Sequence, residues 1–255
     1  MTRARAWGRV ALALALSAIS CTAPGTEARP ASSTLIIGLD VSGSFRDIRQ
    51  YDDAVEFAAI YIYGHLRGLD ELRVPTALFV GSLGGVRPGE AKAFHPINDF
   101  QNRTIEQIAG DLRTWFPPND VYTDFNTFFD RVATLVKERG LVLAPLNVVV
   151  LSDGEPDSPD IRRVRGQPPY AQINLTPLEY LSRSVTVRLL YASPTVGENW
   201  KRLIERRRVR MWTQEAQIMA GWHQQYKVGV PLEQQHDLWQ WVKDNVDYRA
   251  QARLF

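Results

Sequence analysis

Residues 35–47 read LIIGLDVSGSFRD, an apolar run with an unusual polar ending. The first part is short, continuous and rich in β-branched residues, which is typical of a strand buried on both faces of a parallel sheet. It is followed by Asp40, Ser42 and Ser44, three oxygen-bearing side chains at alternate positions. A turn after a strand does not require this pattern, so we predict that the three oxygens are held toward one point.

Strand-like and helix-like segments alternate along the rest of the chain. Strands are predicted at residues 34–41, 73–82, 91–97, 146–154, 184–193 and 208–213. Helical spacing of apolar residues predicts helices at 51–66, 104–115, 127–139, 198–207 and 232–246. The alternation predicts a doubly wound, mainly parallel α/β sheet of about six strands with helices on both faces.

Ligands of such sheets bind outside the carboxyl ends of the strands. Asp40 ends the first strand and Asp153 follows the apolar run VVVL, so both carboxylates are expected on one edge. A middle loop, YTDFNT at 122–127, adds Thr123. With Ser42 and Ser44, these residues make a set of five oxygen donors. Hard divalent cations prefer oxygen. The set contains no Cys or His, which disfavours Zn²⁺. Two carboxylates balance a dication and leave it attractive to an outside anion.

The order Asp-x-Ser-x-Ser, Thr-Asp and Ser-Asp-Gly, with each motif in a loop, resembles a von Willebrand factor type A (VWA) domain with a metal-ion-dependent adhesion site. The resemblance covers about residues 34–246 and suggests a domain at 34–250. It implies a metal site in which Asp124 supports the ligands without touching the metal. The implied metal ligands are Asp40, Ser42, Ser44, Thr123 and Asp153. Mg²⁺ is the expected cation, with Mn²⁺ or Ca²⁺ as alternatives.

Each of these residues also has a purely structural interpretation. Ser42 and Ser44 would serve as turn or helix-cap residues, Thr123 would cap the following helix, and Asp153 would only form a turn. The middle loop also departs from the family pattern, because Tyr122 stands where many relatives have glycine.

The N-terminus predicts export. A basic start and an apolar run at 10–19 are typical of a signal peptide, which we place at residues 1–20. Cys21 follows directly, so the segment resembles a bacterial lipoprotein signal in which Cys21 carries the lipid. An ordinary secretory signal is the alternative. Cys21 is the only cysteine, so no intramolecular disulfide forms. Residues 21–33, with their small and polar composition, predict a flexible tether.

These features favour a binding module over an enzyme. We expect an envelope-tethered domain, on the periplasmic face or the cell surface, whose cation is bridged by an acidic side chain of a partner protein. A net charge of +2 gives no signal for nucleic acid. A metal-assisted, phosphatase-like hydrolase is the alternative, although Ser42 stands where such sites typically carry a second carboxylate. A scaffold with a metal-free site is a further alternative.

Overall fold

The computed structural model describes residues 33–248 except for 88, 91–92, 160 and 162–168. The signal peptide at 1–20, the lipidation residue Cys21 and nearly all of the tether at 21–33 therefore lie outside the described residues. In the described part of the chain, no helix has both the length and the apolar character needed to cross a bilayer.

Eight strands and eight α-helices make up the described structure. The strands are β1 Thr34–Leu39, β2 Ala77–Ser82, β3 Gly84–Gly85, β4 His95–Pro96, β5 Tyr122–Thr123, β6 Leu146–Leu151, β7 Val185–Ala192 and β8 Val209–Glu215. The α-helices are α1 Gly43–Asp47, α2 Gln50–Arg67, α3 Ile105–Trp115, α4 Phe125–Glu138, α5 Pro194–Leu203, α6 Ala216–Met219, α7 Trp222–Gln225 and α8 His236–Asn245. Five short 3₁₀ helices are η1 Leu69–Glu71, η2 Ile97–Asp99, η3 Pro169–Gln172, η4 Thr176–Leu178 and η5 Leu232–Gln234.

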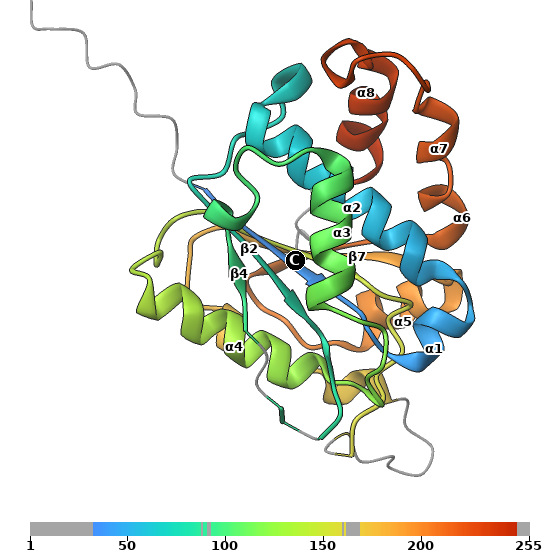
Figure 1. Cartoon of the computed structure of the whole chain (residues 1–255). Coiled ribbons are helices and arrows are strands. Elements are labelled where there is room, and N and C mark those ends of the chain that lie inside the picture. The colour runs from blue at the N-terminus through green and yellow to red at the C-terminus, as the bar shows by residue number, and fades with distance from the viewer. Residues whose placement is uncertain (1–32, 88, 91–92, 160, 162–168, 249–255) are drawn as a thin grey trace, which may run out of the picture. The chain divides into compact units, whose positions relative to one another are not determined.

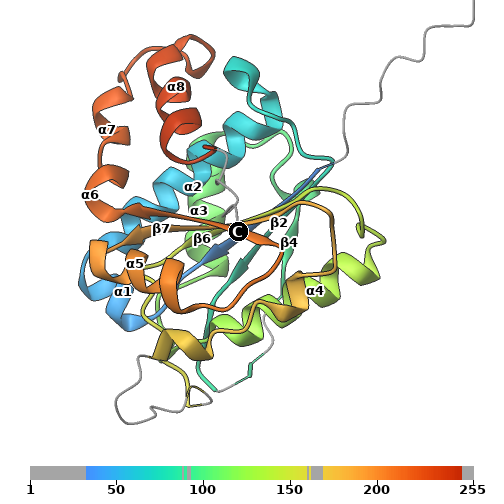
Figure 2. The same ribbon diagram turned by 180° about the vertical axis from the view of Figure 1, so that it is seen from behind.

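The main sheet has six strands in the order β4-β2-β1-β6-β7-β8. Every neighbouring pair is parallel except β2 with β4, where the short edge strand runs antiparallel. Helices cover both faces, with α2, α3 and α8 on one side and α4 on the other (Figures 1 and 2). The predicted doubly wound, mainly parallel sheet is confirmed.

Two apolar clusters lie on the two faces of the sheet. The residues of β1 alternate between them: Leu35, Ile37 and Leu39 face the cluster that contains α2, α3 and α8, whereas Ile36 faces the cluster that contains α4 and α5. Both clusters are buried, which explains why the strand is apolar from Leu35 to Leu39. Burial on both faces fixes the strand register, and this in turn fixes where each strand ends and its loop begins.

Helix ends differ from the predicted ends where capping residues decide them. Helix α4 begins at Phe125, two residues before the predicted start, because the Asp124 carboxylate accepts a hydrogen bond from Thr127 N at 3.0 Å. Helix α5 begins at Pro194 instead of residue 198, because Ser193 caps it and proline suits the first helical turn. The segment predicted as one helix at 232–246 divides into η5 and α8.

Candidate metal site

The first loop leaves β1 through Asp40, whose side chain is fully buried. Its Oδ1 accepts a hydrogen bond from Ser42 N at 2.9 Å, which closes a tight turn. Ser42 caps α1, because its Oγ accepts from Phe45 N at 3.5 Å. The same Oγ lies 3.1 Å from Ser44 Oγ. The structure therefore brings the two serine hydroxyls together, and Ser42 also has the capping role that was its structural alternative.

The third loop is tied to the first by Ser152, which follows β6 and is fully buried. Ser152 Oγ donates to Asp40 Oδ2 at 2.5 Å and accepts from Gly154 N at 3.0 Å. Asp153 Oδ1 accepts from Glu155 N at 3.0 Å. This bridge between the ends of β1 and β6 was missed at the sequence level, although Ser152 stands in the motif Ser-Asp-Gly.

The two carboxylates of the site are unfavourable as a pair of anions. Burial raises the pKa of Asp40, and hydrogen bonds from Ser152 and Ser42 offset part of that effect. Burial, followed by the negative charge of Asp40, raises the pKa of Asp153 to about 6. A dication placed between the carboxylates would relieve both the desolvation and the repulsion.

The middle loop lies against the first loop through its backbone. Asp120 N donates to Val41 O and Gly43 N donates to Asp120 O, each at 3.1 Å. Thr123, which is 1% exposed, lies in β5, which pairs with β3, and it exchanges backbone hydrogen bonds with Asp157. Among the described residues, no hydrogen bond joins the Thr123 hydroxyl to the oxygens of the first loop. The predicted role of Thr123 as a ligand stays a prediction.

Asp120 is a further carboxylate that the sequence did not single out. It is 5% exposed, and its negative charge contributes to the raised pKa of Asp40. Its side chain packs against Gly84 so closely that a Cβ at Gly84 would lie 2.7 Å from Asp120 Oδ2. Asp120 therefore lies close to the first loop through its charge as well as through its backbone hydrogen bonds.

Asp124 serves the helix that it precedes. Its Oδ1 and Oδ2 accept from Thr127 N at 3.0 Å and Thr127 Oγ1 at 2.7 Å. Both carboxylate oxygens thus fix the start of α4. This contact anchors the loop that carries Thr123, so Asp124 positions that residue through the backbone.

The donor set fits a hard cation. Buried carboxylates and adjacent hydroxyls are oxygen donors of the kind that Mg²⁺ prefers. Within the described residues, no group of three or more His, Cys, Asp and Glu side chains is placed to hold a metal. The predicted set differs from such a group because three of its five donors are hydroxyls.

Replacing Ser152 by Ala is expected to lower the free energy of unfolding, because Asp40 loses a hydrogen-bond donor. The variant leaves the buried Asp40 Oδ2 without its hydroxyl donor, which costs about 1–3 kcal/mol of unfolding free energy. Urea denaturation in EDTA measures this cost. Thr134→Ala, which removes an exposed hydroxyl that donates to the Asp130 carbonyl within α4, is the control. Equal stability of Ser152→Ala and wild type would contradict the bridge between the two strand ends.

No model of a known protein family matches the chain, and no curated protein matches it. In fold, it is similar to proximal thread matrix protein 1 from the mussel byssus, with 14% identity over 74% of this chain and 45% of that chain and a TM-score of 0.44. A structure of the same mussel protein with a zinc-occupied MIDAS motif gives a TM-score of 0.43 at the same identity and coverage. The human COPII-coat protein Sec24c gives 9% identity, 73% and 30% coverage and a TM-score of 0.41. The chain spans less than half the length of each of these proteins, and likenesses this distant carry no inference about its function.

Proposed function

We propose that this chain is a VWA-type recognition module that binds a divalent cation, Mg²⁺ first, and captures an acidic side chain of a partner protein. The observation that carries the proposal is the pair of carboxylates, Asp40 and Asp153, held at one edge of the sheet with raised pKa values. Such an arrangement is unfavourable without a cation. Neighbouring hydroxyls supply further oxygen ligands without adding charge.

The chain's own contacts explain how the first loop would hold the cation. Asp40 is fixed by Ser42 N and Ser152 Oγ, so its carboxylate cannot rotate freely. Ser42 and Ser44 present hydroxyls 3.1 Å apart. Asp153 and Thr123 would complete the set from the other two loops. A bound dication would act as an electrophile toward an outside carboxylate.

Exposed apolar side chains beside the middle loop suit a protein partner. Val86 is 56% exposed and Val121 is 59% exposed. Their segments are joined, because Val121 N donates to Gly85 O at 3.2 Å. Apolar contacts around a polar centre are typical of recognition surfaces, in which the buried centre gives most of the affinity. The partner would thus contact the cation and this apolar margin together.

The proposal includes a membrane tether. Cleavage before Cys21 and its acylation would anchor the domain at the bacterial envelope, with residues 21–33 as the linker. Incorporation of radiolabelled palmitate into the wild type, and its loss in Cys21→Ser, is the expected result. A wild type that takes up no label would remove the tether from the proposal and leave the cation site untouched.

Partner capture is tested by a crosslinking pull-down from native envelope extract. We expect the wild type to retain a partner in millimolar Mg²⁺ and to lose it in EDTA. The Asp40→Ala variant should retain no partner in either condition, because it lacks the buried carboxylate that would hold the cation. Asp130→Ala, an exposed carboxylate on α4, is the matched control and should behave as wild type.

Capture that is equal with and without EDTA would contradict metal bridging. Circular dichroism of Asp40→Ala must match the wild type for its loss to count. Turnover of a generic phosphate ester that disappears in Ser44→Ala would favour the hydrolase instead.

A further inference from the structure

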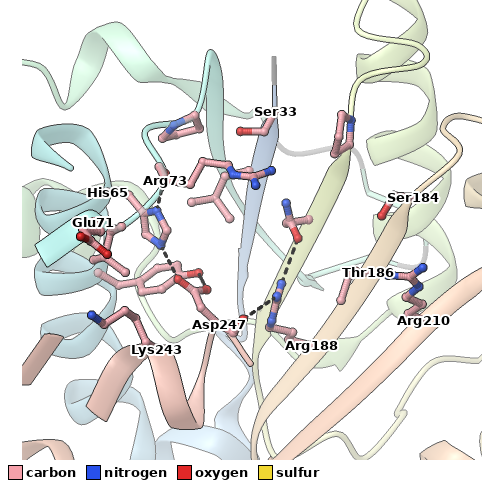
Figure 3. Close-up of a pocket in the computed structure, with 16 residues that line it drawn as sticks. Ser33, His65, Glu71, Arg73, Ser184, Thr186, Arg188, Arg210, Lys243 and Asp247 are labelled. Carbon is pink, nitrogen blue, oxygen red and sulfur yellow. Dashed lines mark hydrogen bonds and ion pairs between the residues drawn. The ribbon is translucent and has the colours of Figure 1, made fainter. Parts of the chain in front are cut away.

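We propose that the opposite edge of the sheet carries a second site, a pocket for a phosphate-bearing ligand. A cavity of about 540 Å³ lies at the amino ends of β1, β6 and β7, beside α2, η1 and α8 (Figure 3). This volume falls in the range of small-molecule sites. Because the candidate metal loops follow the carboxyl ends of β1 and β6, the two sites lie at opposite ends of these strands.

The sheet wall of the cavity is a polar row where apolar residues are expected. Asn147, Thr186 and Arg210 are paired in register across β6, β7 and β8, and Leu35 of β1 is paired with Asn147. Arg188 follows two positions after Thr186 on β7, which lies between β6 and the edge strand β8, and it faces the same side. A strand covered on both faces normally reads as apolar, so these polar residues require a reason.

Arg188 provides the buried charge of the pocket. Arg188 as a whole is only 6% exposed. One terminal nitrogen donates to Asn147 Oδ1 at 3.1 Å and the other to the Asp247 carbonyl at 3.5 Å, and both acceptors are neutral. Its Nε is buried without a hydrogen-bond partner among the described residues. A buried guanidinium in this state favours an anion that accepts its free donor.

The nearby carboxylate of Asp247 is engaged by other side chains. It accepts from Tyr61 Oη at 2.6 Å, and its other oxygen lies 3.1 Å from His65 Nε2. His65 Nδ1 lies 2.8 Å from the Arg73 carbonyl. Both ring nitrogens of His65 therefore lie near oxygen atoms. Burial opposes ionisation of Asp247, but its contact with His65 and the positive charge of Arg188 lower its pKa, so Asp247 is the anion that lies beside Arg188 (Figure 3).

The remaining charged residues of the cavity are mainly cationic. Arg73 and Arg210 line it and have no ion-pair partner among the described residues. Lys243 is paired with Asp70 at 2.7 Å, so it adds no free charge. Glu71 is the opposing carboxylate on the lining. Arg73, Arg188 and Arg210 against the carboxylates of Glu71 and Asp247 leave a surplus of one positive charge, which favours a phosphate group.

Hydroxyl groups complete a set of donors for phosphate oxygens. Ser33, Ser184 and Thr186 line the cavity, and each hydroxyl can donate one hydrogen bond. Arginine with hydroxyl donors is the combination that binds phosphate with defined geometry. The same chemistry would hold either a free phosphate ester or the headgroup of a lipid.

The position of the pocket gives the lipid source a physical basis. Ser33 lines the cavity, and Cys21 lies twelve residues before it, which spans at most about 40 Å of extended chain. If Cys21 is acylated, a headgroup is within reach. This part rests on the proposed anchor, whereas the phosphate chemistry does not.

The test uses the full chain carrying Cys21→Ser, so that no anchor contributes to binding. Isothermal titration with glycerol 1-phosphate, in EDTA, is the soluble arm. Flotation with phosphatidylglycerol vesicles, against phosphatidylcholine vesicles, is the lipid arm. We expect binding in at least one arm, weakened about tenfold by Arg73→Gln and by Arg210→Gln, because each removes a charged donor from an exposed position. Glu71→Gln should strengthen it.

Arg139→Gln, at the end of α4 on the other face of the sheet, is the matched control and should leave binding unchanged. Binding of glycerol 1-phosphate identifies a soluble ligand, whereas binding of phosphatidylglycerol vesicles alone identifies a lipid headgroup. No binding in either arm, or an equal loss in Arg139→Gln, would overturn the pocket. Asp40→Ala should leave phosphate binding intact, so failure of the metal site and failure of this pocket are distinguishable.

Discussion

Asp153→Asn is expected to be more stable than the wild type when divalent cations are absent, and to lose the stabilisation that a cation gives. In the folded chain, burial and the charge of Asp40 raise the pKa of Asp153 from 3.8 to about 6. The folded state therefore binds a proton more tightly than the unfolded state, so stability falls as the pH rises through this window. At neutral pH the full penalty is present. A shift of this size corresponds to about 1–3 kcal/mol, which the neutral amide removes.

The asparagine keeps the local backbone contact, because its Oδ1 still accepts from Glu155 N. Urea denaturation at neutral pH, in EDTA and in millimolar Mg²⁺, gives the four free energies of unfolding. The wild type should gain stability from Mg²⁺ and the variant should not. Asp130→Asn, an exposed site on α4, controls for the change of net charge. A variant that is less stable than the wild type in EDTA would contradict the unfavourable carboxylate pair.

The sheet was predictable because its strands are buried on both faces. The runs around Ile36 and Val149 are apolar at consecutive positions. This pattern identifies a buried strand whichever helices pack on the two faces of the sheet. The position of the edge strand β4 was also predictable, because residues 91–97 have a weak, short strand pattern and β4 lies within them. The exact ends of the helices were not predictable. Several residues near each end could act as the cap, and only the loop geometry shows that Ser193 caps α5.

The oxygen donors of the first loop could be predicted from the sequence because they all follow one strand. Asp40, Ser42 and Ser44 lie within five residues, so their spacing is itself a signal. Ser152 and Asp120 are far from Asp40 in the sequence. Ser152 donates a hydrogen bond to the Asp40 carboxylate, and the negative charge of Asp120 contributes to the raised pKa of Asp40. Only the pairing of β1 with β6 and the fold of the middle loop bring them there.

The pocket at the other edge was hidden for a related reason. The sequence predicts a strand at 184–193, and Arg188 within it forms no recognisable motif. Its meaning depends on Asn147 and Thr186, which reach the same face through strand register.

Gly154→Ala is expected to cause a loss of stability of about 2–4 kcal/mol and to weaken the response to cations. Gly154 has φ +80°, which strains any residue with a Cβ. A Cβ there would also lie 2.6 Å from Leu189 Cδ2 and 2.9 Å from Val196 Cγ1. Trp200, fully buried, donates from Nε1 to the Gly154 carbonyl at 2.8 Å, so the loop cannot move away without losing that hydrogen bond.

Gly229→Ala separates the two causes. Gly229 has φ +81°, almost the same backbone conformation, but no atom lies within 4 Å of the position of an added Cβ. This variant should therefore show only the conformational cost, about 1 kcal/mol. The difference between the two variants in urea denaturation measures the close packing of the third loop against α5 and β7. Because Asp153 directly precedes Gly154, a displaced loop also moves a proposed ligand, so Mg²⁺ should stabilise Gly154→Ala less than Gly229→Ala. Equal losses in the two variants would mean that the loop has room to move, and the position of Asp153 would then not be fixed by this contact.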